Sequence, residues 1–344
     1  MKVKIGELTK IKTGKLDANA ASEDGQYPFF TCSKEPLRIS TYSYDCECVL
    51  VAGNGDLNVK YYNGKFDAYQ RTYIIEDNGS GKLYMPYLYY FMEGYIEELR
   101  KQAIGGVIKY IKLGNLTDAL IELPSVDEQK SIVEILVKAK GILEKRNDEL
   151  NALDNLIKAR FVEMFGTLHD NENGFEVVTI EDVCSLIKDG THQTPQYTEN
   201  KEEGFKFLSS KDVMSQKIDW TDIKYIPAEL HEKLYATIKP WRNDILMSKN
   251  GVNYGVAAVN DTDEIFDIYV SLALLRPKEE IDPVFLRCVI NNPETKRQFD
   301  SSIKGIGVPN LHLGEIRKTK IFLPPIELQK EFVSFAEQVT KSKF

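Results

Sequence analysis

The chain has 344 residues, of which 42% are hydrophobic and 28% are charged, and its net charge at pH 7 is −8. This length is typical of two globular domains, and the negative charge argues against nucleic-acid binding without sequence preference. The sequence has no run of about 18 apolar residues and no apolar segment near its start, so we expect neither a membrane span nor a secretory signal.

The cysteines and histidines give no sign of a metal site or of a disulfide framework. Five cysteines, an odd number without framework spacing, indicate reduced thiols in a cytoplasmic protein. We interpret Cys46 and Cys48 as packing residues on one face of a strand, because no second pair and no nearby histidine accompanies them. The four histidines have no metal-ligand spacing, so no metal is predicted.

Residues 1–124 are predicted to form a mostly β domain. Short runs rich in Val, Ile, Tyr and Phe are separated by Gly, Asn and Asp, as in CVLVAGNGDLNVKYYNGKF. Asn54-Gly55 and Asn63-Gly64 predict hairpin turns, since Asn and Gly tolerate positive φ. The segment 85–101, opened by a proline, predicts one helix. Residues 100–117 then carry four basic residues and no acidic one.

Residues 125–166 are predicted to form a long spacer helix. Ser125 and Glu128 fit a capping box, and Gly166 is a stop signal. A helix of about 40 residues is about 60 Å long, and its apolar stripe needs a partner to cover it. The residues predicted to pair helices are Ile132, Ile135, Ala139, Ile142, Leu143, Leu150, Leu153, Ile157 and Phe161, with Val333 from the second copy described below.

Residues 167–324 predict a second mostly β domain. It has one expected helix at 282–299, and Asn250-Gly251 predicts another hairpin turn. Residues 166–204 hold nine acidic residues and two lysines, whereas residues 296–320 hold six basic residues and two acidic ones. The chain is therefore acidic overall but carries two matching basic segments.

Residues 325–344 begin a second copy of the spacer helix. LPSVDEQKSIVEIL at 123–136 and LPPIELQKEFVSFA at 323–336 lie 200 residues apart, and nine of the 29 positions in 105–133 are identical to those in 305–333. A period near 200 is far too long for a solenoid, so we infer two domains of one fold in tandem. The second copy is about half as long as the first, so it can cover only part of the apolar stripe.

This order of domain, long helix, domain and second helix resembles the specificity subunits of type I restriction–modification systems. The matching motifs include ELPSVDEQKSIVEIL, KARFVEMFG and FLPPIELQKEFVSF in the helices, and GKFDAYQRTYII and DILMSKNGVNYG in the domains. The resemblance implies an α+β fold with two target-recognition domains. Each would read one half of a split, asymmetric site in double-stranded DNA. The two helices would pair antiparallel and set the gap between the halves, and because the second copy is short, we expect this pair to be incomplete.

The resemblance also implies partners. Methylation subunits, which use S-adenosylmethionine, would dock on this frame, and a restriction subunit would join them, while the chain itself would be non-catalytic and hold no cofactor. The residues agree with a non-catalytic chain. NNPE at 291–294 lacks the second proline and the aromatic residue of an adenine methyltransferase motif, and no G-x-x-x-x-G-K-Ser/Thr loop is present.

Sequence-specific DNA reading needs phosphate anchors and side chains that form paired hydrogen bonds with base edges. Loops rich in Asn, Gln, Lys, Arg and Tyr supply both. The candidates in the first domain are Lys34, Asn54, Lys60, Tyr61, Lys65, Gln70, Arg71 and Lys109. Those in the second are His192, Gln193, Lys211, Lys249, Asn250, Tyr254, Lys304 and Asn310. Each lysine is equally typical of a solvated loop, each asparagine of a turn, and the histidine of a packed or capping residue.

Two other functions stay open from the sequence. A truncated or phase-variable DNA-binding adaptor would form a homodimer through the uncovered stripe or compete for methylation subunits. A nuclease is the third reading, and it has little support because no carboxylate cluster can be picked out.

Overall fold

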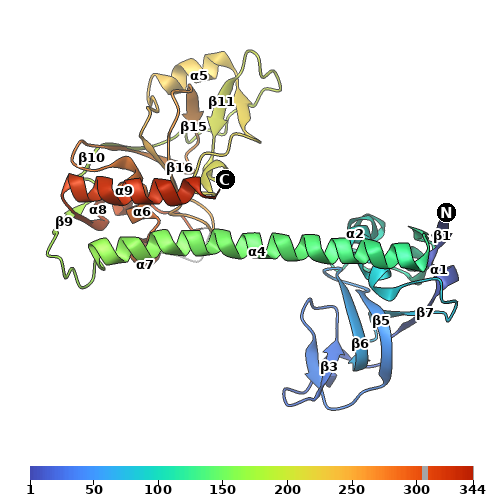
Figure 1. The fold of residues 1–344 in the computed structure, drawn as a ribbon. Coiled ribbons are helices and arrows are strands. Elements are labelled where there is room, and N and C mark those ends of the chain that lie inside the picture. The colour runs from blue at the N-terminus through green and yellow to red at the C-terminus, as the bar shows by residue number, and fades with distance from the viewer. Residues whose placement is uncertain (304–308, 344) are drawn as a thin grey trace. The chain divides into compact units, whose positions relative to one another are not determined.

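The computed structural model describes residues 1–303 and 309–343. The chain divides into two compact units, Met1–Asn147 (unit 1) and Asp148–Phe344 (unit 2). The division falls inside the long helix α4 (Val126–Phe165), whose two halves belong to different units (Figure 1). In the described part of the chain, every helix is too short or too polar to span a membrane.

Unit 1 is built on a six-stranded sheet in the order β2-β7-β5-β6-β3-β4. Strand β1 pairs antiparallel with β8 outside this sheet, and helix α2 packs on β5 and β6. The strands are β1 (Lys2–Lys4), β2 (Thr9–Thr13), β3 (Tyr27–Phe30), β4 (Leu37–Ile39), β5 (Tyr44–Ala52), β6 (Val59–Ala68), β7 (Thr72–Asp77) and β8 (Leu120–Glu122), and the helices are α1 (Ile5–Leu8), η1 (Ala18–Ala20), α2 (Met85–Gln102), α3 (Leu113–Thr117) and the first part of α4.

Strand β5 shows why the sequence folds this way. Its run of apolar residues is continuous because both faces of the strand are covered. Val49 and Val51 face the core under α2, whereas Cys48 and Leu50 face a second cluster on the other side of the sheet, around Phe66. The five cysteines, all within the described residues, are free thiols.

Unit 2 has smaller sheets. They have the orders β10-β16-β13-β14, β12-β11-β15 and β17-β9. The strands are β9 (Glu176–Thr179), β10 (Cys184–Asp189), β11 (Phe205–Leu208), β12 (Lys224–Ile226), β13 (Ile245–Ser248), β14 (Ala257–Val259), β15 (Phe266–Ile268), β16 (Leu272–Pro277) and β17 (Lys320–Leu323). The helices are η2 (Ser210–Val213), α5 (Ala228–Tyr235), α6 (Pro283–Ile290), α7 (Pro293–Ser302), α8 (Leu313–Lys318) and α9 (Ile326–Lys341), with the last part of α4.

The two units repeat one topology. The order β2-β7-β5-β6 corresponds to β10-β16-β13-β14, the order β4-β3-β6 corresponds to β12-β11-β15, and the β1–β8 pair corresponds to β9–β17. The duplication predicted from the 200-residue register is therefore confirmed. One difference stands out: β6 is a single strand of ten residues, whereas its counterpart is divided into β14 and β15 by residues 260–265.

Two local predictions are wrong. Asn63-Gly64 makes no turn but lies inside β6, where both residues pair with β5. The helix expected at 282–299 is two helices, α6 and α7, because Pro293 lacks an N–H and starts a new helix, capped by the Asn292 side chain. Helix α5 in the same unit was also not expected.

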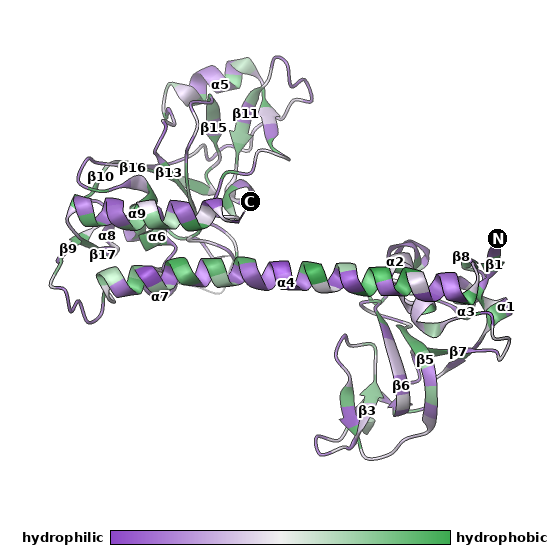
Figure 2. Ribbon diagram, in the orientation of Figure 1, coloured by the Kyte–Doolittle hydropathy of each residue, from purple (hydrophilic) through white to green (hydrophobic). Residues whose placement is uncertain are grey.

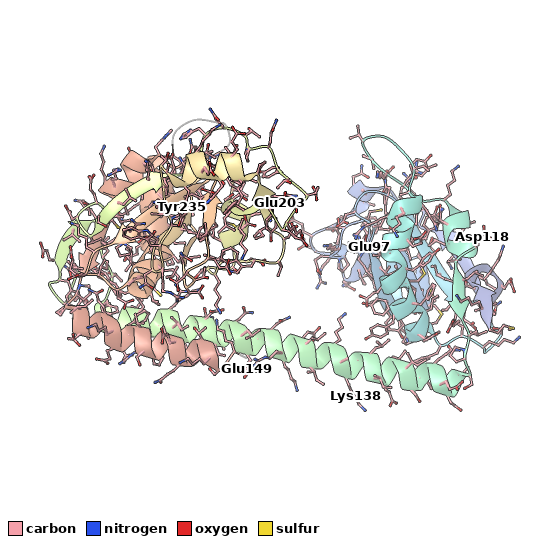
Figure 3. The ribbon with its side chains drawn as sticks, turned by 90° about the horizontal axis from the view of Figure 1, so that it is seen from above. Glu97, Asp118, Lys138, Glu149, Glu203 and Tyr235 are labelled. Atoms are coloured by element: carbon pink, nitrogen blue, oxygen red, sulfur yellow. The ribbon has the colours of Figure 1, made fainter. Side chains whose placement is uncertain are left out.

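Helix α4 begins and ends as predicted. The Ser125 and Glu128 side chains each accept a hydrogen bond from the other residue's backbone N–H. The Ser125 hydroxyl also donates to the Glu128 carboxylate, and this bond, followed by the one from the Ser125 N–H, lowers the pKa of Glu128. Gly166 follows the helix with a φ of 72°. Apolar and polar segments alternate along its length (Figure 2), and the side chains of Lys138 and Glu149 project from it (Figure 3).

Helix α9 pairs antiparallel with the C-terminal part of α4, as expected. Arg160 bonds Glu331 near the start of α9 at 3.1 Å, and Asp154 pairs with Lys343 just beyond its end. Phe161, next to Arg160 in α4, packs edge-on against Phe332 of α9. The two helices lie side by side in both views (Figures 1 and 3).

Candidate nucleic-acid interface

Four loops of unit 1 meet at one end of its large sheet, where the β5–β6 connection turns. The Gly53 N–H donates to the Arg71 carbonyl at 2.8 Å, and the Gly55 N–H donates to the Lys109 carbonyl at 3.0 Å. The Asn58 side chain donates to the Cys32 carbonyl at 2.8 Å. These bonds join residues 31–34, 53–58, 69–71 and 104–110, which we call loop cluster 1.

Loop cluster 1 brings most of the predicted side chains of the first domain together. Lys34, Arg71 and Lys109 are exposed there, and the Lys34 ammonium lies 3.8 Å from Asp56. Lys60 bonds the Asn58 side chain, and burial lowers the pKa of its ammonium. Asn54 and Gln70 also belong to the cluster: Asn54 forms a β-bridge with Tyr110, and Gln70 bonds Asp17 at 3.3 Å.

Two candidates of the first domain lie elsewhere. Tyr61 is the third residue of β6, and its hydroxyl donates to Glu47 at 2.7 Å. The Lys65 ammonium lies 4.6 Å from the centre of the Tyr42 ring, near the strand end away from the hairpin turn. The structure therefore does not group these two side chains with loop cluster 1.

Unit 2 builds an equivalent group of loops. The Lys249 N–H donates to the Ser271 carbonyl, the Gly251 N–H to the Pro309 carbonyl and the Leu311 N–H to the Lys249 carbonyl, at 2.9, 3.0 and 2.7 Å. The Ser210 N–H donates to the Ser271 hydroxyl at 3.0 Å. Loop cluster 2 comprises residues 191–193, 209–213, 249–251, 269–271 and 309–311.

The candidates of the second domain divide into exposed and buried residues. His192, Gln193, Lys211 and Asn310 are exposed, and Asn250 is half-buried. His192 Nε2 lies 3.3 Å from Asp189. Lys304 lies outside the described residues.

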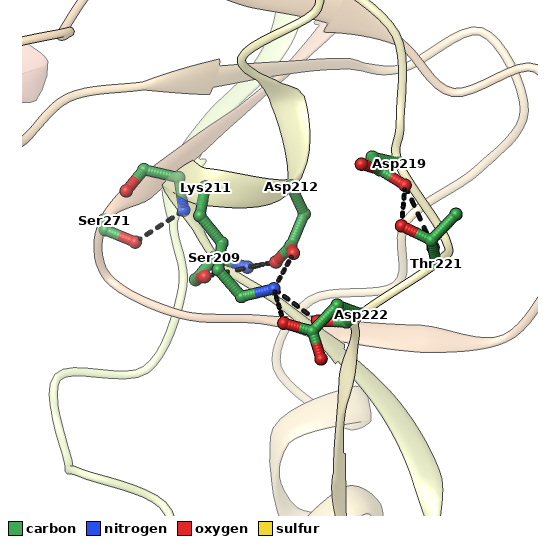
Figure 4. A network of polar contacts seen from close by, with 8 residues as sticks. Ser209, Lys211, Asp212, Asp219, Thr221, Asp222 and Ser271 are labelled. Carbon is green, nitrogen blue, oxygen red and sulfur yellow. Dashed lines mark hydrogen bonds and ion pairs between the residues drawn. The ribbon is translucent and has the colours of Figure 1, made fainter. Parts of the chain in front are cut away.

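Acidic neighbours hold the Lys211 side chain. Its ammonium donates to Asp212 at 2.7 Å and also contacts the carbonyl and carboxylate of Asp222 (Figure 4). Asp212 in turn accepts from Ser209 (Figure 4). Lys211 therefore has to exchange these partners before it can contact a phosphate.

In the structure Lys249 and Tyr254 are buried, so they are not accessible to DNA as the prediction requires. Lys249 is only 4% exposed, and its ammonium is 2.9 Å from Asp189. Tyr254 is 8% exposed, and its hydroxyl donates to Asp300 at 2.5 Å. The polar groups of both side chains are thus bonded to internal carboxylates.

The predicted helix-pairing residues divide into two groups. Leu150, Leu153, Ile157 and Phe161 are buried or half-buried, and the last two pack in the core that also takes Val333 of α9. The other five are exposed: Ile132, Ile135, Ala139, Ile142 and Leu143. In unit 1 the buried residues of α4 are instead Gln129 and Val133. About half of the stripe thus lacks a cover among the described residues.

Sequence reasoning assigned no role to Gln129 and Gln329, although it paired them in the repeat. Both side chains are fully buried. Gln129 accepts from the Tyr84 N–H at 2.8 Å and donates to the carbonyls of Lys82 and Pro124 at 2.8 and 2.9 Å. The amide therefore fastens the first turn of α4 to the segment that enters α2.

Gln329 makes the same three bonds at the start of α9. It accepts from the Asp282 N–H at 2.9 Å and donates to the carbonyls of Glu280 and Pro324 at 3.1 and 2.8 Å. A glutamine stands at the same position in both copies of the repeat, and this match was the sign in the sequence that could have indicated the role. Each unit thus fixes the start of the helix that leaves it.

In the described part of the chain, no group of three or more His, Cys, Asp or Glu side chains is placed to hold a metal ion. The geometry provides two equivalent loop clusters with exposed cationic and amide side chains, and a helix that enters both units. This arrangement suits recognition of an extended polyanion more than chemistry on a small molecule.

Three relatives extend this picture. The specificity subunit of the type I restriction enzyme EcoDI of Escherichia coli is 42% identical over 156 residues, which cover 45% of this chain and 34% of that protein. The MjaVIII specificity subunit of Methanocaldococcus jannaschii is 23% identical over 95% of this chain and 83% of its own length. The EcoBI specificity subunit of E. coli is 21% identical over 85% of this chain and 66% of its own length. The match to the first relative thus spans about a third of that protein.

Solved structures share the fold. A type I restriction–modification S subunit from M. genitalium covers the whole chain with a TM-score of 0.61 at 16% identity, and 90% of that protein is matched. A chain from a structural study of type I system assembly and conformational transition gives a TM-score of 0.52 at 16% identity, with the same coverage. The family model for the type I restriction modification DNA specificity domain matches residues 1–152 and 172–344. The chain therefore belongs to the family of type I restriction–modification DNA specificity domains.

Proposed function

We propose that this chain is the DNA-reading subunit of a type I restriction–modification complex and that its two units read the two halves of a split target. The observation that carries the proposal is the pair of equivalent loop clusters, one in each repeat of the same topology. Their side chains differ: cluster 1 offers Lys34, Arg71 and Lys109, whereas cluster 2 offers His192, Gln193 and Asn310. Different side chains read different bases, so the target is asymmetric.

The chain acts without catalysing a reaction itself. Methylation subunits supply S-adenosylmethionine and the methyl transfer, a restriction subunit joins them, and the complex works in the cytoplasm, where the DNA is. The exposed stripe on α4 supports a docking role, because an apolar surface of this kind marks a protein contact. Ile142 and Leu143 are 67% and 65% exposed, so they are available to a partner.

The test is to co-express the chain with a methylation subunit and map methylated adenines on a genome. We expect two short sequences separated by a constant gap. The double variant Lys34→Ala, Arg71→Ala should relax or weaken reading of one half only, and the double variant Gln193→Ala, Asn310→Ala should do the same for the other half. Methylation at one uninterrupted site, or loss of both halves with either variant, would contradict the proposal.

A homodimeric adaptor is the second candidate, and the uncovered apolar stripe favours it. Two copies of the chain would cover Ile135, Ile142 and Leu143 by pairing their α4 helices. Light scattering of the purified chain should then give a dimer that Leu143→Glu converts to a monomer. A monomer at high protein concentration rules this candidate out.

A further inference from the structure

The loop at residues 104–110 in cluster 1 is a small, ordered hairpin. Ile104 and Tyr110 exchange two backbone hydrogen bonds, of 3.0 and 2.8 Å. Gly105 has a φ of 121°, and a Cβ there would lie 2.6 Å from the Ile108 carbonyl oxygen. Only glycine fits this position. The bond from the Gly55 N–H to the Lys109 carbonyl ties the hairpin to the β5–β6 turn.

The tip of this hairpin is apolar and projects into solvent. Val107 is fully exposed and Ile108 is 62% exposed. Neither belongs to a hydrophobic cluster of the described residues, so the fold of unit 1 does not require either side chain. An aliphatic pair at a loop tip, held by an ordered hairpin stem, indicates a contact with something outside the chain.

The surroundings of the tip are cationic. Residues 100–117 contain Arg100, Lys101, Lys109 and Lys112 and no acidic residue. Arg100 is taken up by Asp56 and Glu97, and Lys101 lies 3.5 Å from Glu98. Lys109 and Lys112 are exposed on either side of Tyr110. The tip thus combines two aliphatic side chains with ammonium groups suited to phosphates.

We propose that Val107 and Ile108 form a wedge that inserts at a base-pair step of the DNA and unstacks it, while Lys109 and Lys112 contact the flanking phosphates. This inference rests on the proposed DNA-reading function. Aliphatic wedges of this kind kink DNA, and the kink brings more protein surface against the duplex. Pyrimidine–purine steps deform most easily, so the wedge selects such a step without hydrogen bonds to its bases.

The second repeat carries a sequence counterpart. Gly305 matches Gly105, and Ile306 and Val308 supply aliphatic residues beside Lys304. These five residues, 304–308, lie outside the described part of the chain. The backbone just after them is anchored as in the first repeat, with bonds from the Gly251 N–H to Pro309 and from the Leu311 N–H to Lys249. The proposal is therefore made for Val107 and Ile108.

The experiment compares the wild-type chain, bound to its methylation subunit, with the double variant Val107→Ser, Ile108→Ser. The probe is a double-stranded DNA that carries the methylated site mapped as above, with 2-aminopurine placed at successive steps. Methyltransferases flip their target base out of the stack, so the methylated adenines give a signal of their own. At one further step we expect wild type to raise the fluorescence, and we expect it to bend the DNA there. The double variant should abolish both signals and bind about tenfold more weakly.

Two control variants distinguish the effect of the wedge from that of a lost phosphate contact and from that of losing any exposed apolar side chain. Lys109→Ala should lower the slope of log K against log salt by about 1, whereas the wedge variant should leave this slope unchanged. Leu120→Ser removes an apolar side chain that is 52% exposed on β8, outside loop cluster 1, and it should match wild type.

The outcomes are distinct. Specific binding by wild type without a fluorescence or bending signal at a further step overturns the wedge and leaves the proposed function intact, as does a wedge variant that binds and bends like wild type. No specific binding by the wild-type complex overturns the proposed function and the wedge with it.

Discussion

The substitution Gln129→Met tests whether the buried amide fastens α4 to unit 1. Methionine has a similar length and volume, so the packing is largely kept while all three hydrogen bonds are lost. The Tyr84 N–H and the carbonyls of Lys82 and Pro124 would then lose this buried partner. Each unsatisfied group costs about 1–3 kcal/mol. Because the carbonyls are only partly buried and the costs are not additive, we expect a total of about 3 kcal/mol.

Scanning calorimetry of the intact chain measures this loss. For a unit of this size, about 1 kcal/mol lowers Tm by about 2–4 °C, so the transition of unit 1 should fall by about 6–12 °C. Gln329→Met should lower the transition of unit 2 instead. Gln102→Met is the matched control, since its half-buried amide bonds the Tyr95 and Glu98 side chains. If Gln129→Met costs no more than this control, the fastening role is refuted.

The further predictions concern unit 2 and its Cys184 thiol. Phe161→Ala should lower the free energy of unfolding, measured by urea titration, by about 3–5 kcal/mol, because Phe161 packs on Phe285, Phe322 and Phe332. The control Val162→Ala changes an exposed side chain and should alter the same free energy by less than about 0.5 kcal/mol. Asp189→Asn should lower the free energy of unfolding by about 3 kcal/mol in the same titration, because it leaves the Lys249 ammonium buried without its carboxylate. A double variant that also carries Lys249→Met should recover most of this loss. Burial raises the pKa of the Cys184 thiol to about 12 from an ordinary value of 9.0, so mass spectrometry should find Cys184 unmodified by iodoacetamide in the native chain at pH 8. Since only the unfolded thiol ionises between these two values, this group's contribution to stability is complete below pH 9 and should fall as the pH rises from 9 towards 12.

The repeat made much of the fold predictable from the sequence. The 200-residue register located two copies of one domain and the start of both helices, because core and turn positions keep their spacing when a fold is duplicated. The capping box at Ser125 and the stop at Gly166 were readable because they depend on local backbone chemistry. The apolar stripe showed that α4 needs a partner, and the resemblance to the specificity subunits implied that α9 would pair with it antiparallel.

The remaining details depend on tertiary contacts. Asn63-Gly64 favours a turn locally, but pairing with β5 holds it extended in β6. Lys249 was predicted to bind a phosphate, but its ammonium binds Asp189, which is sixty residues away in sequence. The sequence predicted the membership of loop cluster 1 better than that of cluster 2, since the side chains of cluster 1 have fewer internal partners. No periodicity marks a buried glutamine, so its role became visible only with its backbone partners.

The division of one strand into two distinguishes the two readers in how they fluctuate. In unit 1, β6 pairs with β5 along one part of its length and with β3 at its end. The two parts of the sheet therefore separate only if the hydrogen bonds of β6 break. In unit 2 the same path is interrupted between β14 and β15. The three-stranded sheet with β11 and β12 therefore has a hinge of its own and should exchange its amide hydrogens earlier than the four-stranded sheet. We therefore expect unit 1 to open as one piece and unit 2 to open its three-stranded sheet while its four-stranded sheet stays paired.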